Sequence, residues 1–383
     1  MDCQKHLFSL PDDHHYLNCA YMSPLLNKVF KAGEKGLRQK QEPWIIEPRH
    51  FFKDSDRLRS LFAKLVNAPE AEQIAILPSA SYGLSTVAKN LPQNTSKKIV
   101  VVGEQFPSNV YPWMRFCKET NSDLEIIRAP ENFENRAQHW NEKILDAIDQ
   151  NTLMVAIGNV HWTDGTLFDL KAISKKTQNT GAYLVIDGTQ SVGALPFDIR
   201  EIQPDALICA GYKWLMGPYS IALGYFGPKF QNGIPLEEGW LDRKGSEDFA
   251  GLVNYVDEYQ PGAIRFDMGE RSNFILVPMM IKAIEQLLEW GPENIQTYCR
   301  ELTQELVDEL PDLGYRIEET EWRSHHLFGI RLPKHISAKE LKQELSQKKI
   351  HISVRGTAIR ISPNVYNDEN NIAALLEILR NIK

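Results

Sequence analysis

The stretch Tyr183-Leu184-Val185-Ile186-Asp187-Gly188-Thr189-Gln190 is an apolar run that ends in an acidic residue. A second apolar run, residues 206–209, leads to Gly211-Tyr212-Lys213. Short apolar runs separated by helical stretches are typical of a mainly parallel sheet buried on both faces. Ligands of such sheets lie beyond the carboxyl ends of the strands. Because Asp187 and Lys213 both follow strand ends, the sequence predicts that they share one site.

An aspartate and a lysine in these positions suit one cofactor. A carboxylate at the end of a buried strand can face the protonated nitrogen of a pyridine ring, and a lysine can form an imine with an aldehyde on that ring. Pyridoxal 5′-phosphate needs both partners, since its ring accepts electrons from a carbanion at the substrate Cα while the lysine moves protons. Either residue alone is more often a solvated charge. Together they predict a pyridoxal-phosphate site.

The chain resembles the class V aminotransferases of the fold-type I pyridoxal-phosphate enzymes, a group with isopenicillin N epimerase-like, cysteine desulfurase-like and kynureninase-like members. The matching residues are Val185-Ile186-Asp187-Gly188-Thr189-Gln190-Ser191-Val192-Gly193, Cys209-Ala210-Gly211-Tyr212-Lys213-Trp214 and Gly217-Pro218. The resemblance implies that Asp187 pairs with the pyridinium nitrogen and that Lys213 forms the internal aldimine. It also implies that Gln190 lies near the phenolic oxygen of the ring and that Tyr212 approaches the phosphate.

The predicted fold class is α/β, the fold type I of pyridoxal-phosphate-dependent transferases, with a large domain and a smaller C-terminal α/β domain. Seven strands are expected in the large, mainly parallel sheet, at residues 74–77, 98–102, 124–127, 153–157, 183–186, 206–209 and 221–225. The small domain is expected to contain strands at 327–332, 351–354 and 358–361, and helices at 295–310 and 371–382, the last capped by Asn367 or Asp368. The expected domains are a large cofactor-binding domain at 21–265 and a small domain at 266–383, against which an N-terminal segment, 1–20, packs.

Composition excludes several classes of function. The chain has 383 residues and a formal net charge of −7 without a basic block, so nucleic acid is not an expected partner. Its polar start lacks the apolar segment of a signal peptide, and no apolar run is long enough to cross a bilayer. Five scattered cysteines have neither paired nor metal-ligand spacing. We expect a cytoplasmic protein with reduced thiols, no metal and no membrane partner.

The stretch Pro78-Ser79-Ala80-Ser81-Tyr82-Gly83 lies between a predicted strand and a predicted helix. A helix N-terminus offers free N–H groups and a partial positive charge to a phosphate. The resemblance places the cofactor phosphate against the backbone of Ala80 and Ser81, with the Ser81 hydroxyl as a further donor. A plain serine N-cap is the alternative.

Aromatic residues follow two further strands. The resemblance places Phe106, in the Phe-Pro form of kynureninase-like sequences, over the face of the ring, where a phenyl group stacks but transfers no proton. A core aromatic is the alternative. Trp162 occupies a position that lies beside the cofactor or substrate in the family, and the neighbouring His161 is either a structural histidine or a catalytic one.

An arginine near the C-terminus matches the carboxylate clamp of the family. The stretch Arg360-Ile361-Ser362-Pro363-Asn364-Val365-Tyr366-Asn367 implies that Arg360 grips the substrate α-carboxylate with two parallel hydrogen bonds, with Arg355 near the pocket mouth. A solvent-facing strand arginine is the alternative. The N-terminal segment around Asn18 approaches the pocket in the family, so Asn18 is a further predicted substrate contact.

Cysteine desulfurases carry a nucleophilic cysteine between these two arginines, whereas this interval reads Gly356-Thr357-Ala358-Ile359. Persulfide formation on an enzyme thiol is therefore not expected. Cys19 is interpreted as a small packing residue. The family is dimeric with shared active sites, and Asn273 or Ser272 matches the phosphate ligand that one subunit lends to the other.

We therefore expect a homodimeric pyridoxal-phosphate enzyme that binds a small amino acid through Arg360 and removes its α-proton with Lys213. Transamination or epimerase-like chemistry at Cα is the first hypothesis. Elimination of a sulfur- or selenium-bearing side chain, without a loop cysteine, is the second. A third is a binding protein without catalysis, against which the imine-forming Lys213 argues.

Overall fold

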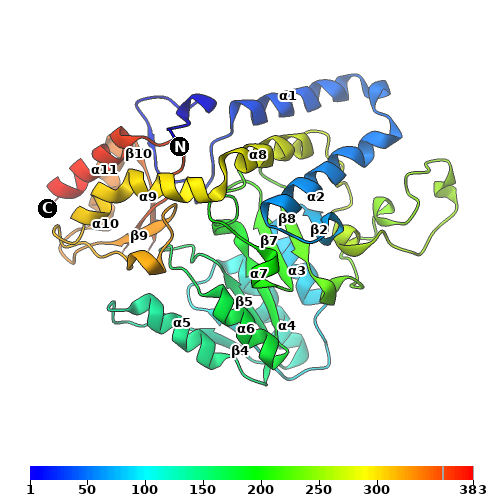
Figure 1. The fold of residues 1–383 in the computed structure, drawn as a ribbon, viewed down its shortest axis with the longest axis horizontal. Helices are drawn as coiled ribbons and strands as arrows, with labels where there is room; N and C mark the ends of the chain where they lie inside the picture. Colours follow the sequence, from blue (N-terminus) through cyan, green and yellow to red (C-terminus); the bar gives the residue numbers. More distant parts are fainter. Residues whose placement is uncertain (356–357, 383) are drawn as a thin grey trace.

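A computed structural model of the chain describes residues 1–355 and 358–382. Gly356 and Thr357, part of the interval that lacks a thiol, lie outside the described residues. The chain builds one large sheet and two small ones, with the small ones at the end of the molecule where both termini lie (Figure 1). Among the described residues no helix has the length and apolarity that crossing a membrane requires.

The large sheet has seven strands in the order β2-β8-β7-β6-β5-β3-β4. Strand β8 runs antiparallel to β2 and β7, and the other neighbouring pairs are parallel. This arrangement confirms the predicted mainly parallel sheet. The bounds are β2 Ile74–Leu77, β3 Lys98–Val102, β4 Leu124–Ile127, β5 Thr152–Gly158, β6 Tyr183–Asp187, β7 Ala206–Ala210 and β8 Ala222–Phe226.

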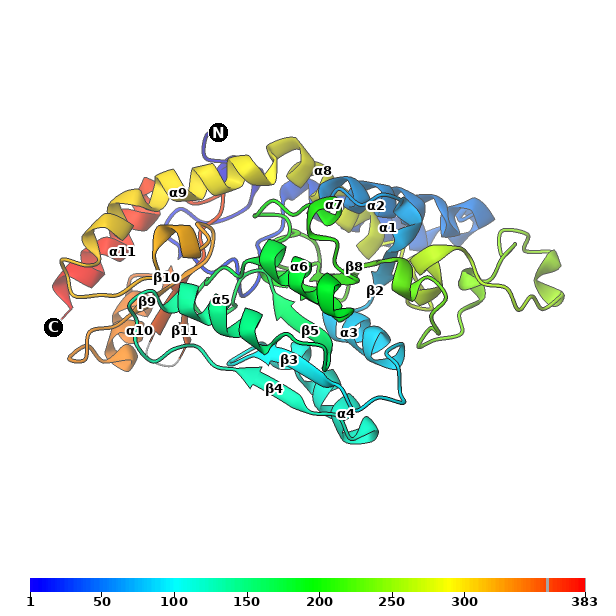
Figure 2. The ribbon, with the colours of Figure 1, turned by 60° about the horizontal axis from the view of Figure 1, so that its bottom comes forward.

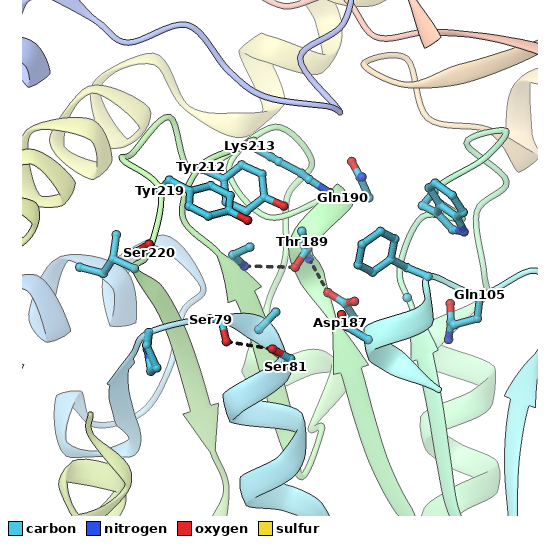
Figure 3. Close-up of a pocket in the computed structure, with 18 of the residues that line it drawn as sticks. Ser79, Ser81, Gln105, Asp187, Thr189, Gln190, Tyr212, Lys213, Tyr219 and Ser220 are labelled. Carbon is cyan, nitrogen blue, oxygen red and sulfur yellow. Dashed lines mark hydrogen bonds between the residues drawn. The ribbon is translucent and has the colours of Figure 1, made fainter. Parts of the chain in front are cut away.

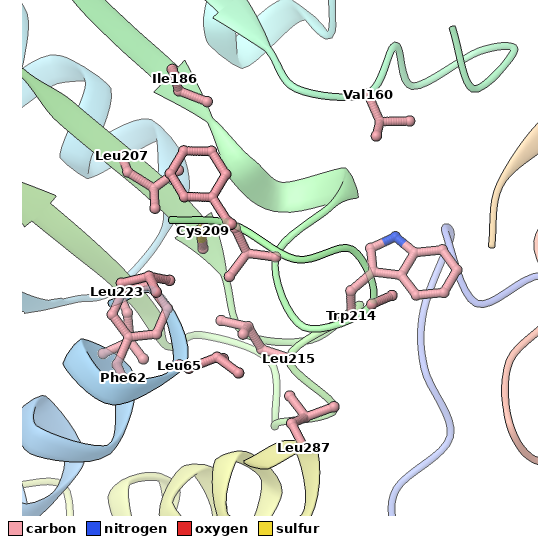
Figure 4. Close-up of a cluster of buried hydrophobic side chains, with 14 of the residues drawn as sticks. Phe62, Leu65, Val160, Ile186, Leu207, Cys209, Trp214, Leu215, Leu223 and Leu287 are labelled. Atoms are coloured by element: carbon pink, nitrogen blue, oxygen red, sulfur yellow. The ribbon is translucent and has the colours of Figure 1, made fainter. Parts of the chain in front are cut away.

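Alternating side chains of the strands enter two cores, one on each face of the sheet. Ile74 and Ile76 lie in one core, and Ala75 and Leu77 lie in the other. Helices α3 (Ala80–Lys89) and α4 (Tyr111–Thr120) cover one face. The other face packs against helices that include α2 and α8: Phe62 of α2 lies beside Leu223 of the sheet, and Leu287 of α8 lies near Leu215 in the same core (Figure 4). The bounds of the helices on this side are α1 Asn27–Gln41, α2 Lys53–Leu65, α5 Arg136–Ala147, α6 Leu170–Thr180, α7 Ile199–Ile202 and α8 Leu276–Trp290.

The C-terminal part is built on a three-stranded antiparallel sheet in the order β11-β12-β9. Its elements are α9 Pro292–Glu309, β9 Phe328–Arg331, α10 Ala338–Gln347, β11 Ser353–Arg355, β12 Ala358–Ile361 and α11 Glu369–Asn381. Helix α9 begins three residues before its predicted start, because Pro292 fits the first turn of a helix. Asp368 caps α11 as predicted, accepting a hydrogen bond from the N–H of Asn371 at 3.1 Å.

The N-terminal segment reaches the C-terminal part (Figure 2). Strand β1 (His15–Tyr16) pairs in parallel with β10 (Ile350–His351), and Asn18 bridges to Ser362. The single strand predicted at 351–354 is therefore two strands, since β10 pairs with β1 whereas β11 pairs with β12. The domain boundaries after residues 20 and 265 stay a prediction.

Candidate active site

A cavity lies beyond the carboxyl ends of β5, β6 and β7, against the N-terminus of α3 (Figure 3). It brings together most of the residues that the sequence singles out. The lining residues are Pro78, Ser79, Ala80, Ser81, Gln105, Phe106, Ser108, Gly158, Val160, Trp162, Asp187, Thr189, Gln190, Ala210, Tyr212, Lys213, Tyr219, Ser220 and Ile221.

Asp187, the last residue of β6, lines the cavity. Its Oδ1 accepts a hydrogen bond from the N–H of Thr189 at 3.0 Å. Burial raises its pKa, and the Thr189 hydrogen bonds and the Lys213 charge oppose that rise only in part. It forms no ion pair with any described residue, so a cation placed in the cavity would be stabilised by it.

Lys213 follows β7 and is 6% exposed. Its Nζ lies 5.2 Å from the centroid of the Phe106 ring and 5.5 Å from that of Tyr212. Burial lowers the pKa of this amine to about 8, aided by Arg360 and Arg355 and opposed by Asp187. A lysine with this pKa has a sizeable free-amine fraction near neutral pH, which a nucleophile or general base needs.

Gln190 and Trp214 hold the loop that carries Lys213. The Gln190 side chain accepts from Trp214 Nε1 at 2.9 Å and donates to the carbonyl of Ala20 at 3.1 Å, which leaves one amide N–H of Gln190 for a ligand. Gly193 has φ +105°, and a Cβ there would lie 2.3 Å from the carbonyl oxygen of Trp214. Only glycine allows these two loops to approach so closely.

The N-terminus of α3 presents free donors to the cavity. Ser79 is the N-cap, and its hydroxyl accepts from the N–H of Tyr82 at 3.1 Å. The helix starts at Ala80, so the serine N-cap is Ser79, and Ser81 lies inside the first turn. The N–H groups of Ala80 and Ser81 have no acceptor among the described residues, and Ser81 Oγ lies 2.9 Å from Ser79 Oγ. This end suits an anion.

Phe106 and Trp162 form an aromatic wall. Their rings meet edge to face, with centroids 5.3 Å apart. Trp162 Nε1 donates to the carbonyl of Glu104 at 2.6 Å, which fixes the indole. The neighbouring His161 does not line the cavity; it is buried, with its ring nitrogens 3.2 Å from Asp164 Oδ1 and 3.2 Å from the carbonyl of Gly103. It is a structural histidine.

A second chamber, which we call the mouth chamber, continues from the cavity and shares five lining residues with it. It is lined by Ala20, Tyr21, Met22, Phe106, Trp162, Tyr212, Lys213, Tyr219, Arg355 and Arg360. Arg360 is 1% exposed and donates to the carbonyl of Trp162 at 2.7 Å. Burial, together with Arg355, lowers the pKa of its guanidinium to about 9. Neither arginine pairs with a carboxylate of the described residues.

Several residues singled out by the sequence, among them Asn18, Asn273 and Cys19, line neither chamber. Asn18 accepts a hydrogen bond from the Ser353 hydroxyl at 2.8 Å, and Ser353 in turn lies 3.4 Å from Arg360. Asn273 caps the start of α8 by accepting from the N–H groups of Ile275 and Leu276, and it lines a separate hollow. Cys19 is buried, and burial raises the pKa of its thiol to about 11.

Comparison with known proteins decides the family. The model of the aminotransferase class-V family matches residues 49–375. The chain belongs to this family. Class V aminotransferases are enzymes that use pyridoxal 5′-phosphate and act on amino-acid substrates, and they are typically dimeric.

Individual relatives of this class V protein differ in their reactions. An uncharacterized aminotransferase, YcbU of Bacillus subtilis, is 26% identical over 96% of this chain and 94% of its own length. A probable cysteine desulfurase of Pyrococcus abyssi is 24% identical over 85% of this chain and 82% of its own. The solved structure of the cystine C–S lyase C-DES with its product, cysteine persulfide, covers 97% of this chain and 98% of its own, with a TM-score of 0.83 and 17% identity. This last likeness establishes the fold.

The residues of the cavity fit pyridoxal 5′-phosphate. The unpaired Asp187 carboxylate suits a pyridinium, the Lys213 amine suits an aldehyde, and the free N–H groups of Ala80 and Ser81 suit a phosphate. These three groups line one cavity.

Sequence reasoning missed several residues of the site. Thr189 lies inside the quoted stretch, and its Oγ1 accepts from the N–H of Ala210 at 3.1 Å, so it joins the ends of β6 and β7. Its position between Asp187 and Gln190, two predicted site residues, could have marked it as part of the site. His326 donates to the carbonyl of Gln190 at 2.8 Å, with its ring edge to face with Trp214. No local pattern marks that contact, which spans 136 residues of sequence.

Proposed function

We propose that this class V enzyme binds a small amino acid through Arg360 and moves the proton at its Cα with Lys213, in a transamination or a related Cα reaction. The observation that carries the proposal is that a buried amine with a pKa of about 8 and a buried, unpaired guanidinium line the same chamber. Such pairs of perturbed groups in a cavity are typical of catalytic sites.

The cofactor cavity is proposed to hold its ligand at three points. Asp187 would face the ring nitrogen and keep it charged, while Ala80 and Ser81 would donate to the phosphate. The remaining N–H of Gln190 is proposed to donate to the ring oxygen, and Tyr212, which lines the cavity, is proposed to approach the phosphate. When bound, pyridoxal 5′-phosphate supplies an electron sink for negative charge at Cα.

Proton transfer is assigned to Lys213 alone. Apart from Asp187, the described lining residues include no other carboxylate, amine or imidazole. Phe106 stacks and transfers no proton, and burial raises the pKa of Tyr212. A single base supports transamination, in which one group carries a proton between two carbons, better than an epimerisation that uses a separate base on each face.

Arg360 is proposed to bind the α-carboxylate. Its guanidinium is buried without a counter-ion, and its Nε has no partner among the described residues. A carboxylate that accepts two parallel hydrogen bonds would satisfy both the charge and the free donor. Arg355 is proposed to lie beside the substrate, and Asn18 to act through Ser353 rather than by direct contact.

A homodimer with shared active sites is proposed as the working form. Large apolar side chains are exposed over the segments 30–45 and 234–256, including Phe30, Trp44, Trp240 and Tyr255. Such a surface is typical of an interface. Asn273 lines the hollow beside Trp240, away from the cavity of its own chain, which suits a contact with a second copy. A cytoplasmic location stays a prediction from the sequence.

Elimination from a sulfur- or selenium-bearing amino acid is the second candidate. It is favoured by the absence of any cysteine among the described lining residues, since a C–S lyase that releases its sulfur product needs no enzyme thiol. Cys19, behind the chamber, has a pKa of about 11 and stays a neutral thiol.

Product analysis separates these candidates. The holoenzyme is incubated with a panel of L- and D-amino acids, and the pyridoxamine form of the cofactor, free sulfide or selenide, and racemised substrate are assayed. We expect pyridoxamine formation that an added keto acid reverses. Release of sulfide with pyruvate would instead establish the lyase. A Lys213→Ala protein that keeps its full biological activity would support a binding protein and contradict both.

A further inference from the structure

The mouth chamber contains two arginines on one face of the β11–β12 hairpin. Ser353 pairs with Arg360, and Arg355 pairs with Ala358. Residues two apart on a strand point to the same face of the sheet. Arg355 therefore lies diagonally across the hairpin from Arg360, and the lining of the chamber includes both side chains.

These two positive charges lack negative partners. No acidic residue is among the described residues that line the mouth chamber. Among the described parts of the chain, Arg360 donates only to the carbonyl of Trp162 and to the Ser353 hydroxyl, and Arg355 donates only to the carbonyl of Val354. The Nε atoms of both arginines are buried without a partner among the described residues. Like charges this close on one sheet face are destabilising until an anion joins them.

The proposed function supplies one anion for two guanidiniums. If the α-carboxylate binds Arg360 as proposed, the charge of Arg355 stays without a partner among the described residues. Its guanidinium lies 5.1 Å from the centroid of the Trp162 ring, a cation–π contact that orients the group while Arg355 lines the chamber as a half-buried residue.

We propose that the preferred substrate is an amino acid whose side chain ends in a second oxyanion, and that Arg355 binds that group. The proposal rests on the proposed function and deepens it. Diagonal neighbours on a hairpin lie roughly 7–8 Å apart, so the two anionic groups belong to the two ends of one short amino acid. A carboxylate and a sulfur oxyanion both fit the planar fork of arginine.

The Trp162 indole and the Phe106 ring, which form one wall of the chamber, give it an apolar side. The methylene groups between the two anions would pack there. A neutral side chain of equal size would make this contact but would leave the Arg355 charge without a partner. The chamber therefore selects for charge at the far end of the substrate rather than for apolar bulk.

Titration of the holoenzyme tests the proposal through the cofactor absorbance. Dissociation constants are measured for the acid and amide pairs L-aspartate with L-asparagine and L-glutamate with L-glutamine, and for L-cysteine sulfinate. We expect the better acid to bind about 10- to 100-fold more tightly than its amide, the range of a hydrogen-bonded charge. Comparison of the dissociation constants of L-aspartate and L-glutamate with that of L-cysteine sulfinate shows which oxyanion is preferred. Calorimetry with succinate and butyrate, which lack the amine, checks the preference without any reaction.

The Arg355→Gln variant should lose most of this discrimination, so that the ratio of acid to amide dissociation constants approaches one. Arg355→Lys should keep part of it, because the charge remains without the fork. Arg316→Gln, on the exposed surface of the same domain, is the matched control and should change neither constant. Equal affinity of the native holoenzyme for acids and amides would overturn the inference and leave the proposed function intact. If no amino acid changes the absorbance, the proposed function itself fails.

Discussion

The pKa of Lys213 gives the sharpest quantitative prediction. An ordinary lysine has a pKa of 10.5, and burial lowers that of Lys213 to about 8. At pH 7 the fraction of free amine is then about 300-fold larger than in an ordinary lysine. Because the free amine attacks the aldehyde, apoprotein should capture pyridoxal 5′-phosphate at a rate that rises with pH and levels off above about 8.

The assay is stopped-flow absorbance of apoprotein mixed with the cofactor across pH 6 to 11, with the rate plotted against pH. The Arg360→Met variant should shift the midpoint upward, since the Arg360 charge lowers the pKa of Lys213. Asp187→Asn should shift it downward, because the carboxylate opposes that effect. Lys229→Ala, which removes an exposed lysine paired with Asp205, is the control and should leave the profile unchanged. A midpoint at or above pH 10 would refute the reasoning.

The same pKa has a consequence for stability. The difference between 10.5 and about 8 corresponds to roughly 3 kcal/mol. The unfolded chain holds the proton of Lys213 more tightly than the folded protein does, so this cost is present below pH 8 and is removed as the pH rises toward 10.5. Lys213→Met apoprotein should therefore unfold at a higher urea concentration than the native apoprotein at pH 7, and the difference should shrink by pH 10.

Three further predictions concern the neighbours of Lys213. Asp187→Asn should raise the melting temperature of the apoprotein at pH 7 in calorimetry, because the fold raises the pKa of this carboxyl and its ionised form is destabilising. This gain should vanish as the pH falls toward 3.8, and the cofactor should stabilise the variant less than the native protein. Ser79→Ala should lower the free energy of unfolding by about 1 kcal/mol because the helix loses its N-cap, whereas Ser81→Ala should leave that free energy unchanged and weaken cofactor affinity in a fluorescence titration. Equal effects of the two changes would contradict the roles of Ser79 as cap and Ser81 as phosphate donor. Gly193→Ala should destabilise the protein by at least about 2 kcal/mol in urea, since its Cβ would collide with the Trp214 carbonyl, and native-like unfolding would contradict the close approach.

The large sheet was predictable because its signals are local. Each strand is a short apolar run, and the seven runs expected from the sequence match the seven observed strands to within one residue at either end. The choice of Asp187 and Lys213 rested on the same logic, since both follow strand ends that a parallel sheet brings to one edge. Pairing of β1 with β10 was not predictable, because strands of two residues leave no periodic pattern.

Contacts through the backbone also left no signal in the sequence. Trp162 holds Arg360 with its carbonyl oxygen, which any residue at this position would offer. Ser79 rather than Ser81 caps α3, and two serines so close in sequence give no basis for choosing between them. The contact of His326 with Gln190 joins two distant segments, and it depends on how the C-terminal part packs against the sheet.

Borohydride reduction of the holoenzyme tests the central claim most directly. The native protein loaded with cofactor should absorb near about 410 to 430 nm, as a lysine-bound pyridoxal cofactor does. Reduction should abolish that band, and peptide mass mapping should then locate the cofactor on Lys213. A holoenzyme without the band, or a reduced protein in which Lys213 is unmodified, would contradict the account and leave only a shared fold.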